Sequence, residues 1–204
     1  MALPQDTLDE IALLAQQFGT PITSVVRVCS HAFWQRTTSN RTREVCMVIR
    51  RPNGKLLTFT KSFYPQGLYR LFTGGVEPGE QVLEALEREV EEETGLQVNM
   101  QRLLAVVAYC AEDDPQGSID AVRFATFAFL LNETGGMLTV TDPDEPITDY
   151  KEIEPSEVLA IADQLDHLPA EQSPVLQELW SDWGRFRAVI HYVVGELLLA
   201  DSTE

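Results

Sequence analysis

The segment from Gly74 to Leu96 constrains this chain more than any other feature, because it joins a glycine-rich loop to a strongly acidic helical stretch. It reads GGVEPGE, then seven residues, then REVEEETGL. Eight glutamates lie between Glu77 and Glu93, with Arg88 as the only base among them. Like charges one turn apart destabilise a helix. A divalent cation bound to these carboxylates would relieve that repulsion and turn the segment into a binding site.

The same segment predicts one amphipathic helix with defined ends. The pair Pro78-Gly79 is typical of a turn, and Glu80 after it suits the first helical turn, so the helix is expected to open at Gly79-Glu80. Gly95 is the usual left-handed residue that ends a helix. The buried stripe at three- and four-residue spacing is formed by Leu83, Leu86 and Val90.

Three of the glutamates share one face of this helix. At 100° per residue, Glu89, Glu92 and Glu93 lie within about 100° of one another and flank the apolar stripe. The opposite, solvated face carries Glu84, Glu87 and Glu91. An ordinary charged helix surface is the alternative interpretation of the first three. The two loop glycines, the spacing of Arg88 and the closing Gly95 favour a magnesium site, because Mg²⁺ takes oxygen ligands and keeps room for phosphates.

Nine positions of the segment match a known signature without a gap: the segment resembles the Nudix box of the Nudix hydrolases. The matching residues are Gly74, Glu80, Arg88, Glu89, Val90, Glu92, Glu93, Gly95 and Leu96. The resemblance implies an α/β fold, an α/β/α sandwich with a mixed sheet. It also implies that Glu92 and Glu93 are principal metal ligands, with the Gly74 carbonyl nearby. Glu89 is then a ligand or the general base, and Arg88 braces a carboxylate, either Glu84 or Glu92.

The activity implied by this resemblance is a Mg²⁺-dependent pyrophosphohydrolase, with Mn²⁺ as an alternative ion, in which Arg88, Glu89 and Glu92 are catalytic. Its expected substrate is a nucleoside diphosphate linked to another group. Two rival classes are a catalytically silent nucleotide-binding or regulatory module of the same fold and a calcium-binding or structural acidic helix. The retained glutamates argue against the first, and carboxylates packed on a helix face argue against the second.

The box does not fix the general base. Glu89 is preferred because it lies one turn from Glu92 and Glu93. The alternatives are carboxylates in two acidic loops: Glu112, Asp113 and Asp114, or Asp142, Asp144 and Glu145.

The named substrate also stays open. Family members that cleave ADP-ribose commonly carry a proline fifteen or sixteen residues beyond the last box glycine, where this chain has Cys110 and Ala111. Members that act on dinucleoside polyphosphates tend to place a tyrosine where this chain has Glu112 and Asp113. Neither signature is present.

Substrate recognition is expected from the turn-rich loop that leads into the box. Tyr64 or Tyr69 could stack on a base, and Arg70 could pair with a phosphate distant from the attacked one. The alternative is that the aromatic side chains fill the core beneath the loop and that Arg70 has a role in folding.

Charge is distributed unevenly along the chain of 204 residues, whose formal net charge is −17. The stretch from Arg27 to Arg70 holds nine of the 15 cations and one of the 32 acids, Glu44. These cations, among them Arg36, Arg41 and Arg50, would serve phosphates, or they merely decorate loops or a subunit contact. The overall negative field makes a nucleic-acid polymer an unlikely partner.

Other features indicate a cytoplasmic, non-membrane protein. No apolar run approaches eighteen residues, and no basic region precedes Arg27, so neither a membrane span nor a secretory signal is expected. The three cysteines have no paired spacing and are interpreted as small buried hydrophobic residues in a reducing compartment. A homodimer is left open.

The elements predicted along the chain define three parts. Residues 1–40 form an N-terminal extension, residues 41–168 the hydrolase domain, and residues 169–204 a C-terminal helix for core or dimer packing. Helices are expected at 5–17, 79–95, 155–165 and from Ser173-Pro174 onward. Strands are expected at 22–34, 44–51, 55–61, 69–73, 103–110 and 122–131, with turns at 52–54 and 134–136.

Overall fold

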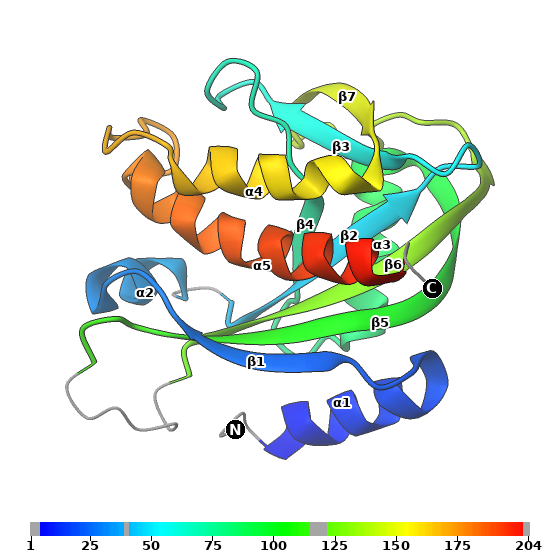
Figure 1. Ribbon diagram of the computed structural model, residues 1–204, viewed down its shortest axis with the longest axis horizontal. Coiled ribbons are helices and arrows are strands. Elements are labelled where there is room, and N and C mark those ends of the chain that lie inside the picture. The colour runs from blue at the N-terminus through cyan, green and yellow to red at the C-terminus, as the bar shows by residue number, and fades with distance from the viewer. Residues whose placement is uncertain (1–4, 39–40, 115–121, 202–204) are drawn as a thin grey trace.

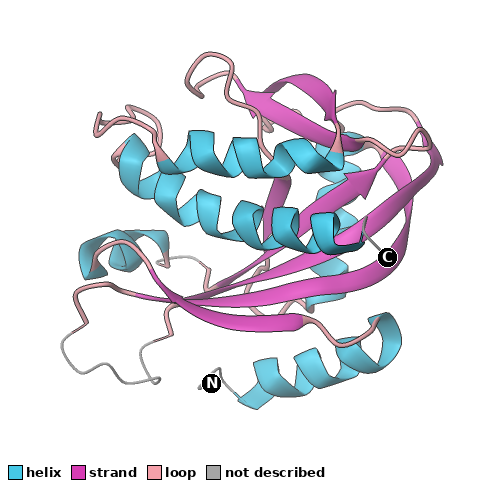
Figure 2. Cartoon of the chain, viewed as in Figure 1, coloured by secondary structure: helices cyan, strands magenta, loops and turns pink. Residues whose placement is uncertain are grey.

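Seven strands form one mixed sheet, and helices cover both of its faces (Figure 2). The computed structural model describes residues 5–38, 41–114 and 122–201. The strands are β1 (Ile22–Arg27), β2 (Arg43–Arg50), β3 (Leu56–Lys61), β4 (Phe72–Gly75), β5 (Leu96–Cys110), β6 (Phe124–Gly136) and β7 (Ile147–Ile153). The helices are α1 (Gln5–Phe18), α2 (His31–Thr37), α3 (Val82–Thr94), the short η2 (Pro155–Glu157), α4 (Val158–Asp166) and α5 (Trp180–Asp201).

The strand order is β1-β5-β6-β2-β3-β7, with β4 paired to β2. The pairs β1–β5 and β2–β6 are parallel, and the remaining pairs are antiparallel. The first half of β2 pairs with β4, whereas only Arg50 at its end pairs with Leu56 of β3. This split places the box loop after β4 beside the start of β2.

The core has two layers, one on each face of the sheet. On one face α1 and α3 pack against alternate strand residues, with Leu14, Val82 and Val90 among the buried side chains. On the other face α4 and α5 lie side by side across the sheet, and α2 adds Phe33 and Trp34 (Figure 1). The fold is therefore the predicted α/β/α sandwich with a mixed sheet. The division of the chain into three parts stays a prediction.

Several predicted elements form where expected. The helices α1 and α4, the hairpin turn between β2 and β3, and the strand β6 all appear. The strand predicted at 103–110 also forms, but β5 begins earlier, at Leu96. Gly95 has a φ of 61° and ends α3 in the left-handed conformation, as predicted. The helix itself begins later than expected, with Gln81 rather than Gly79-Glu80 at its start, because Gln81 and Glu84 form a reciprocal capping box.

The predicted strand at 22–34 is wrong in its second half. After β1 the backbone of Cys29 turns to a φ of 59°, and the Ser30 hydroxyl accepts a hydrogen bond from the Phe33 amide. That N-cap starts α2, which places Phe33 and Trp34 in the core as a helix.

Two further predictions fail near the sheet edge and the C-terminus. The turn predicted at 134–136 is the end of β6, where Gly136 pairs with Leu96. The C-terminal helix begins at Trp180 rather than near Ser173, because the chain first forms a turn in which Gln177 has a φ of 57°. The strand β7 was not predicted.

The N-terminal helix is tied directly to the box helix. Glu10 accepts a hydrogen bond from the Val82 amide at 2.6 Å and pairs with Arg43 at 2.7 Å. A carboxylate at this position satisfies a free amide at the positive end of α3. The sequence of α1 thus helps to fix where α3 begins.

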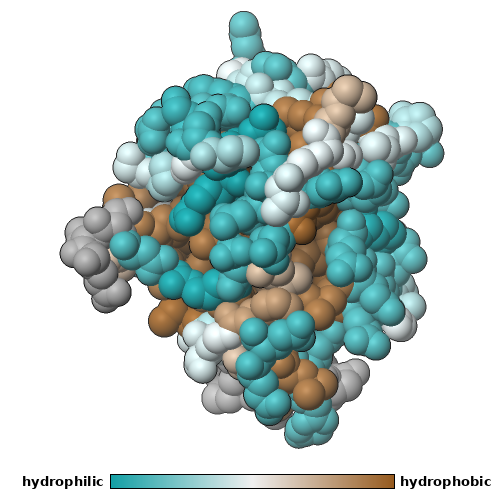
Figure 3. All heavy atoms as spheres, turned by 90° about the vertical axis from the view of Figure 1, so that its right-hand side faces the viewer, coloured by the Kyte–Doolittle hydropathy of each residue, from teal (hydrophilic) through white to brown (hydrophobic). Residues whose placement is uncertain are grey.

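Figure 3 shows the face of the molecule that forms the right-hand side of Figure 1. This face is mostly hydrophilic, with apolar side chains gathered toward its centre. In the ranges that the structure describes, no helix is both long and apolar enough to cross a membrane.

Candidate functional site

Close packing of the end of β4 against α3 explains the need for glycine at position 74. An added Cβ at Gly74 would lie 2.0 Å from Cδ of Glu89. Real Cβ atoms do not approach another carbon so closely, so any larger residue would displace Glu89. The structure therefore brings together Gly74 and Glu89, two of the predicted site residues.

Arg88 organises the carboxylates around it. It donates to Glu80 at 2.9 and 3.0 Å, to Glu89 at 3.0 Å and to Glu92 at 3.0 Å, and its Nη2 also donates to the Gly75 carbonyl at 2.8 Å. The predicted contact with Glu92 is present, whereas Glu84 is used in the helix cap instead. One guanidinium thus links the loop, the start of the helix and the acidic face.

Glu93 is the most buried carboxylate of the box, with a side chain only 1% exposed. Its Oε1 lies 3.4 Å from Nζ of Lys61, and its Oε2 is buried with no hydrogen-bond partner among the described residues. Burial raises the pKa of Glu93 from 4.5 to about 7, even though the charges of Lys61 and Arg70 oppose the rise. A buried, unpartnered anionic oxygen is costly, and a bound cation would offset that cost.

Glu89 and Glu92 differ from Glu93 in exposure. Burial also raises the pKa of Glu89, although the nearby Arg88 charge acts against this shift. The side chain of Glu92 is 34% exposed and reaches the surface of the same helical face. The exposure of the three carboxylates thus increases from Glu93 through Glu89 to Glu92.

The residues fit a divalent metal ion in chemistry, but their side chains are not gathered around one point. Among the described residues, no group of three His, Cys, Asp or Glu side chains is placed to hold one ion. Arg88 draws the carboxylates of Glu89 and Glu92 toward itself. The orphaned Oε2 of Glu93 and the oxygen-rich donor set nevertheless suit Mg²⁺ or Mn²⁺.

The two acidic loops proposed as alternative sources of a base lie in different places. The amides of Thr141 and Asp142 donate to the Glu92 carbonyl, and Glu145 binds Lys61 at 2.6 Å beside Glu93. The other loop faces α2 and α5.

In that second loop, Glu112 pairs with Arg185, and Asp113 accepts a hydrogen bond from the His31 amide. Glu112 and Asp113 thus bind groups on α5 and α2, respectively. Glu145 of the loop at 141–145 shares the contact with Lys61 that Glu93 makes, and the identity of the general base stays a prediction.

The predicted recognition residues pack into the protein. Arg70 is 3% exposed and donates to the Tyr64 hydroxyl, the Leu71 carbonyl and the Thr73 hydroxyl. Its guanidinium also lies 4.6 Å from the ring centroid of Phe59. These contacts favour the alternative in which Arg70 holds the loop in place.

The two tyrosines differ from each other. Tyr64 packs against Trp180 and Trp183, whereas the hydroxyl of Tyr69 donates to Asp149 at 2.5 Å near the surface. Their substrate contacts stay a prediction.

A buried ion pair beneath the site was not predicted. Arg187 of α5 donates to both oxygens of Glu44 at 2.8 and 2.7 Å, and Thr126 donates to the same carboxylate at 2.9 Å. Both charged residues are buried, Glu44 completely. The lone acid in a cationic stretch was the one sequence signal for Glu44, and its partner lies 143 residues away.

His191 adds a second link between α5 and the strand before the box. Its Nε2 accepts a hydrogen bond from the Leu71 amide at 3.0 Å, and its Nδ1 lies 2.7 Å from the Arg187 carbonyl. Burial lowers the pKa of His191 to about 3, so it is neutral with its proton on Nδ1. The C-terminal helix therefore supports the chain that carries Arg70 and Gly74.

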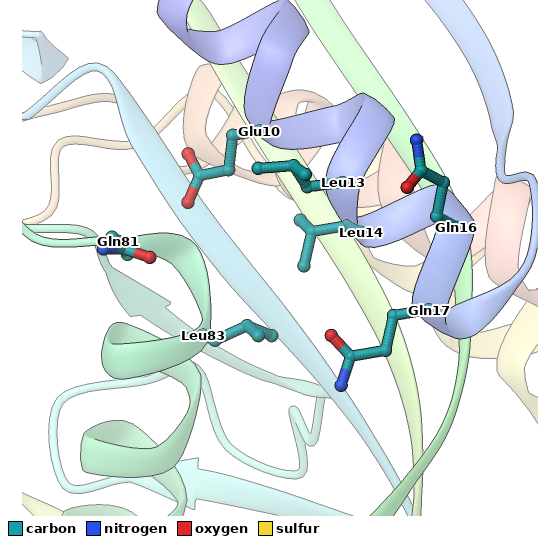
Figure 4. A pocket seen from close by; sticks show the side chains of 7 residues that line it. All are labelled: Glu10, Leu13, Leu14, Gln16, Gln17, Gln81 and Leu83. Atoms are coloured by element: carbon teal, nitrogen blue, oxygen red, sulfur yellow. The ribbon is translucent and has the colours of Figure 1, made fainter.

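Two hollows lie beside α3 and have different lining residues. One of about 360 Å³ lies at the box loop and is lined by Arg41, Arg88, Glu89 and residues 75–78. The other, of about 470 Å³, lies between α1 and α3, where Leu14 and Leu83 point into the same space (Figure 4). Of the predicted catalytic residues, Arg88 and Glu89 line the first hollow and Glu92 does not, whereas none of the three lines the second.

The three cysteines are free and buried, as the sequence predicted: Cys29, Cys46 and Cys110. Burial raises the pKa of each thiol, so none is a ready nucleophile.

Two proteins of known activity are similar in sequence to part of this chain. An ADP-ribose pyrophosphatase of Methanocaldococcus jannaschii is 38% identical over 96 residues, which are 47% of this chain and 53% of that protein. The human 8-oxo-dGDP phosphatase NUDT18 is 40% identical over 73 residues, which are 36% of this chain and 19% of that protein. The chain thus aligns with about half of one relative and a fifth of the other.

Among solved structures, the MutT protein from Methanosarcina mazei Go1 resembles the fold with a TM-score of 0.47 and 18% identity. That likeness covers 81% of this chain and 97% of the other. A family model described as the NUDIX domain matches residues 40–179, well over half of the chain. This chain therefore belongs to the NUDIX domain family.

Proposed function

We propose that this protein is a divalent-cation-dependent hydrolase that cleaves the phosphoanhydride bond of a nucleoside diphosphate linked to another group. The observation that carries the proposal is the constellation on α3: buried Glu93 with an orphaned oxygen, and Glu89 and Glu92 held by Arg88 beside Gly74. Membership of the NUDIX family supports it. The two curated relatives are named for nucleoside diphosphate compounds, which supports the substrate class.

Glu92 and Glu93 would hold the ion, Mg²⁺ or Mn²⁺, with Glu89 and the Gly74 carbonyl beside them. A divalent ion there neutralises charge on a polyphosphate and lowers the pKa of water. Arg88 positions the carboxylates, because it contacts Glu89 and Glu92 through the same nitrogen. Both must be released at least in part from Arg88 before they can turn toward an ion.

Glu89 is the proposed general base that takes a proton from the attacking water. Its burial supports this role, because a raised carboxyl pKa brings a base closer to neutral pH. Glu145 is the alternative, since it lies close enough to influence the pKa of both Glu89 and Glu93.

A catalytically silent nucleotide-binding module is the second candidate. All four box carboxylates, from Glu80 to Glu93, are retained, and such a module has no need of them. The enzyme is therefore preferred. A cytoplasmic location and a homodimer stay predictions.

Chromatography of the two expected products, the nucleoside monophosphate and the phosphorylated second group, tests the proposal over a panel of nucleoside diphosphate derivatives. The reactions are run with Mg²⁺ or Mn²⁺ and then with a chelator. We expect hydrolysis of at least one derivative that stops when the cation is removed. Equal turnover with the chelator, or binding without any turnover, would reject the enzyme in favour of the module.

A further inference from the structure

A third hollow opens beside the one at the box loop, and the two have one lining residue in common. It has a volume of about 590 Å³ and lies between α2, the turn at 176–178 and α5. Arg41 lines this hollow and also lines the one at the box loop. The side chain of Arg41 therefore lies where a ligand would pass from one space to the other.

Arg41 is held in place by its packing but keeps donors available. An added Cβ on Gly75 would lie 2.6 Å from Nη1 of Arg41, so the guanidinium rests directly on the box loop. Among the described residues its ion-pair partner is Glu44, at a distance of 4.0 Å. Glu44 already accepts close hydrogen bonds from Arg187 and Thr126. The side chain of Arg41 is 37% exposed, which leaves it open to a ligand.

The other arginines of the hollow are committed to close partners. Arg36 donates to both carboxylate oxygens of Glu178, at 2.5 and 2.7 Å. Arg187 donates to Glu44. Arg41 is thus the arginine whose position and long ion pair best suit an incoming phosphate, which a guanidinium can bind with two parallel hydrogen bonds.

The rest of the lining indicates what is attached to that phosphate. Aromatic side chains of Phe33, Trp183 and Phe186 line the hollow together with the exposed amide of Gln35 and that of Gln177. Apolar lining with a few polar groups is typical of a site for a flat organic ring, and the volume suits a ligand of that size. Amide groups can hydrogen-bond a base edge or a ribose hydroxyl.

We propose that this hollow binds the nucleoside half of the substrate and that Arg41 binds the phosphate next to it. The inference rests on the proposed function only for the position of the attacked bond. Arg41 lines both the hollow that contains Glu89 of α3 and the aromatic hollow. A substrate that spans both spaces carries its nucleoside beside α2 and α5 and its second group toward α3.

Calorimetric titration in the presence of a chelator tests the proposal without any need for turnover. The probes are ADP, GDP, UDP and CDP, with inorganic pyrophosphate as the ligand that lacks a nucleoside. We expect at least one nucleoside diphosphate to bind the wild type more than 10-fold tighter than pyrophosphate. A silent module would give the same result, so failure of hydrolysis and failure of this proposal are distinguishable.

Two variants separate the phosphate contact from the nucleoside site. Arg41→Ala should raise the Kd of both nucleoside diphosphate and pyrophosphate by about 10- to 100-fold, the scale of a lost charge-assisted hydrogen bond. Gln35→Trp fills the hollow from an exposed position on its rim, so it should raise the Kd of the nucleoside diphosphate alone, about 10-fold or more.

The matched control is Arg50→Ala, which removes an arginine from the far end of β2. Arg50 lies roughly 23 Å along the strand from Arg43, at about 3.3 Å per residue. It should leave every Kd unchanged. Arg41→Lys keeps the charge and should give an intermediate Kd, which guards against a folding defect in the alanine variant. Equal binding of nucleoside diphosphates and pyrophosphate to the wild type, or unchanged binding in Gln35→Trp, would overturn the proposal.

Discussion

Removing the charge of Glu93 should make the metal-free protein more stable at high pH, although it destroys a proposed metal ligand. The carboxyl is 1% exposed, and burial raises its pKa from 4.5 to about 7. Below pH 4.5 the carboxyl is protonated in the folded and unfolded chains, so it costs nothing. Above pH 7 it is ionised in both, and the folded chain bears the full penalty.

The size of the penalty follows from the pKa shift. At 1.36 kcal/mol per unit, the difference between 4.5 and about 7 corresponds to about 3 kcal/mol at most. Glu93→Gln should therefore gain up to about 3 kcal/mol over the wild type as pH rises from 4.5 to 8. The gain should disappear at pH 4.5, because the wild-type carboxyl is then neutral as well.

Urea unfolding with a chelator at several pH values measures this difference directly. Glu87→Gln is the matched control, because it removes the same charge from an exposed position on the same helix. Adding Mg²⁺ at pH 8 should stabilise the wild type by about 2.7 kcal/mol at 100 times the Kd and Glu93→Gln by much less. A difference between wild type and Glu93→Gln that stays constant across the pH range would refute the burial argument.

Three further substitutions test other contacts. Glu89→Gln should lower kcat and remove the acidic limb of the pH profile; if only Glu145→Gln does so, the base lies in the loop at 141–145. Gly74→Ala should cut kcat more than 10-fold with a small loss in melting temperature, because its Cβ would lie 2.0 Å from Cδ of Glu89; normal kcat would show that Glu89 need not stay where it lies. Arg187→Met leaves the buried Glu44 carboxylate without its main partner and should cost about 3–5 kcal/mol in urea unfolding; a cost below about 1 kcal/mol would mean that the pair is not needed for folding.

Local signals in the sequence predicted most of the box helix but not its start at Gln81. The buried Leu86 and Val90, the capping residue Gly95 and the contact between Arg88 and Glu92 all depend on residues within a few turns of one another. The buried strands were predictable for the same reason, since their apolar runs are long. The α/β/α sandwich was predicted from the family resemblance, and the packing of helices on both faces of the sheet confirms it.

The parts that failed depend on local backbone geometry or on distant partners. The apolar residues near Phe33 suited a strand or a helix equally, and the left-handed Cys29 with the Ser30 cap decided for a helix. Gly136 suited a turn, but its neighbour in space is Leu96, forty residues earlier, and their pairing extends β6. Arg70 is buried in the structure, and its position in a turn-rich loop of the sequence gave no sign of that burial.

The most direct test of the central claim is the hydrolysis rate of Glu92→Gln beside that of the wild type, with Mg²⁺ and the best substrate of the nucleotide panel. The side chain of Glu92 is partly exposed, and its hydrogen-bond partner among the described residues is Arg88, so its replacement should leave the fold intact. The account predicts a fall in kcat of about 10²–10³, the scale of losing one strong transition-state stabiliser, with Glu87→Gln unchanged. Wild-type turnover by Glu92→Gln would contradict the metal-dependent mechanism on α3.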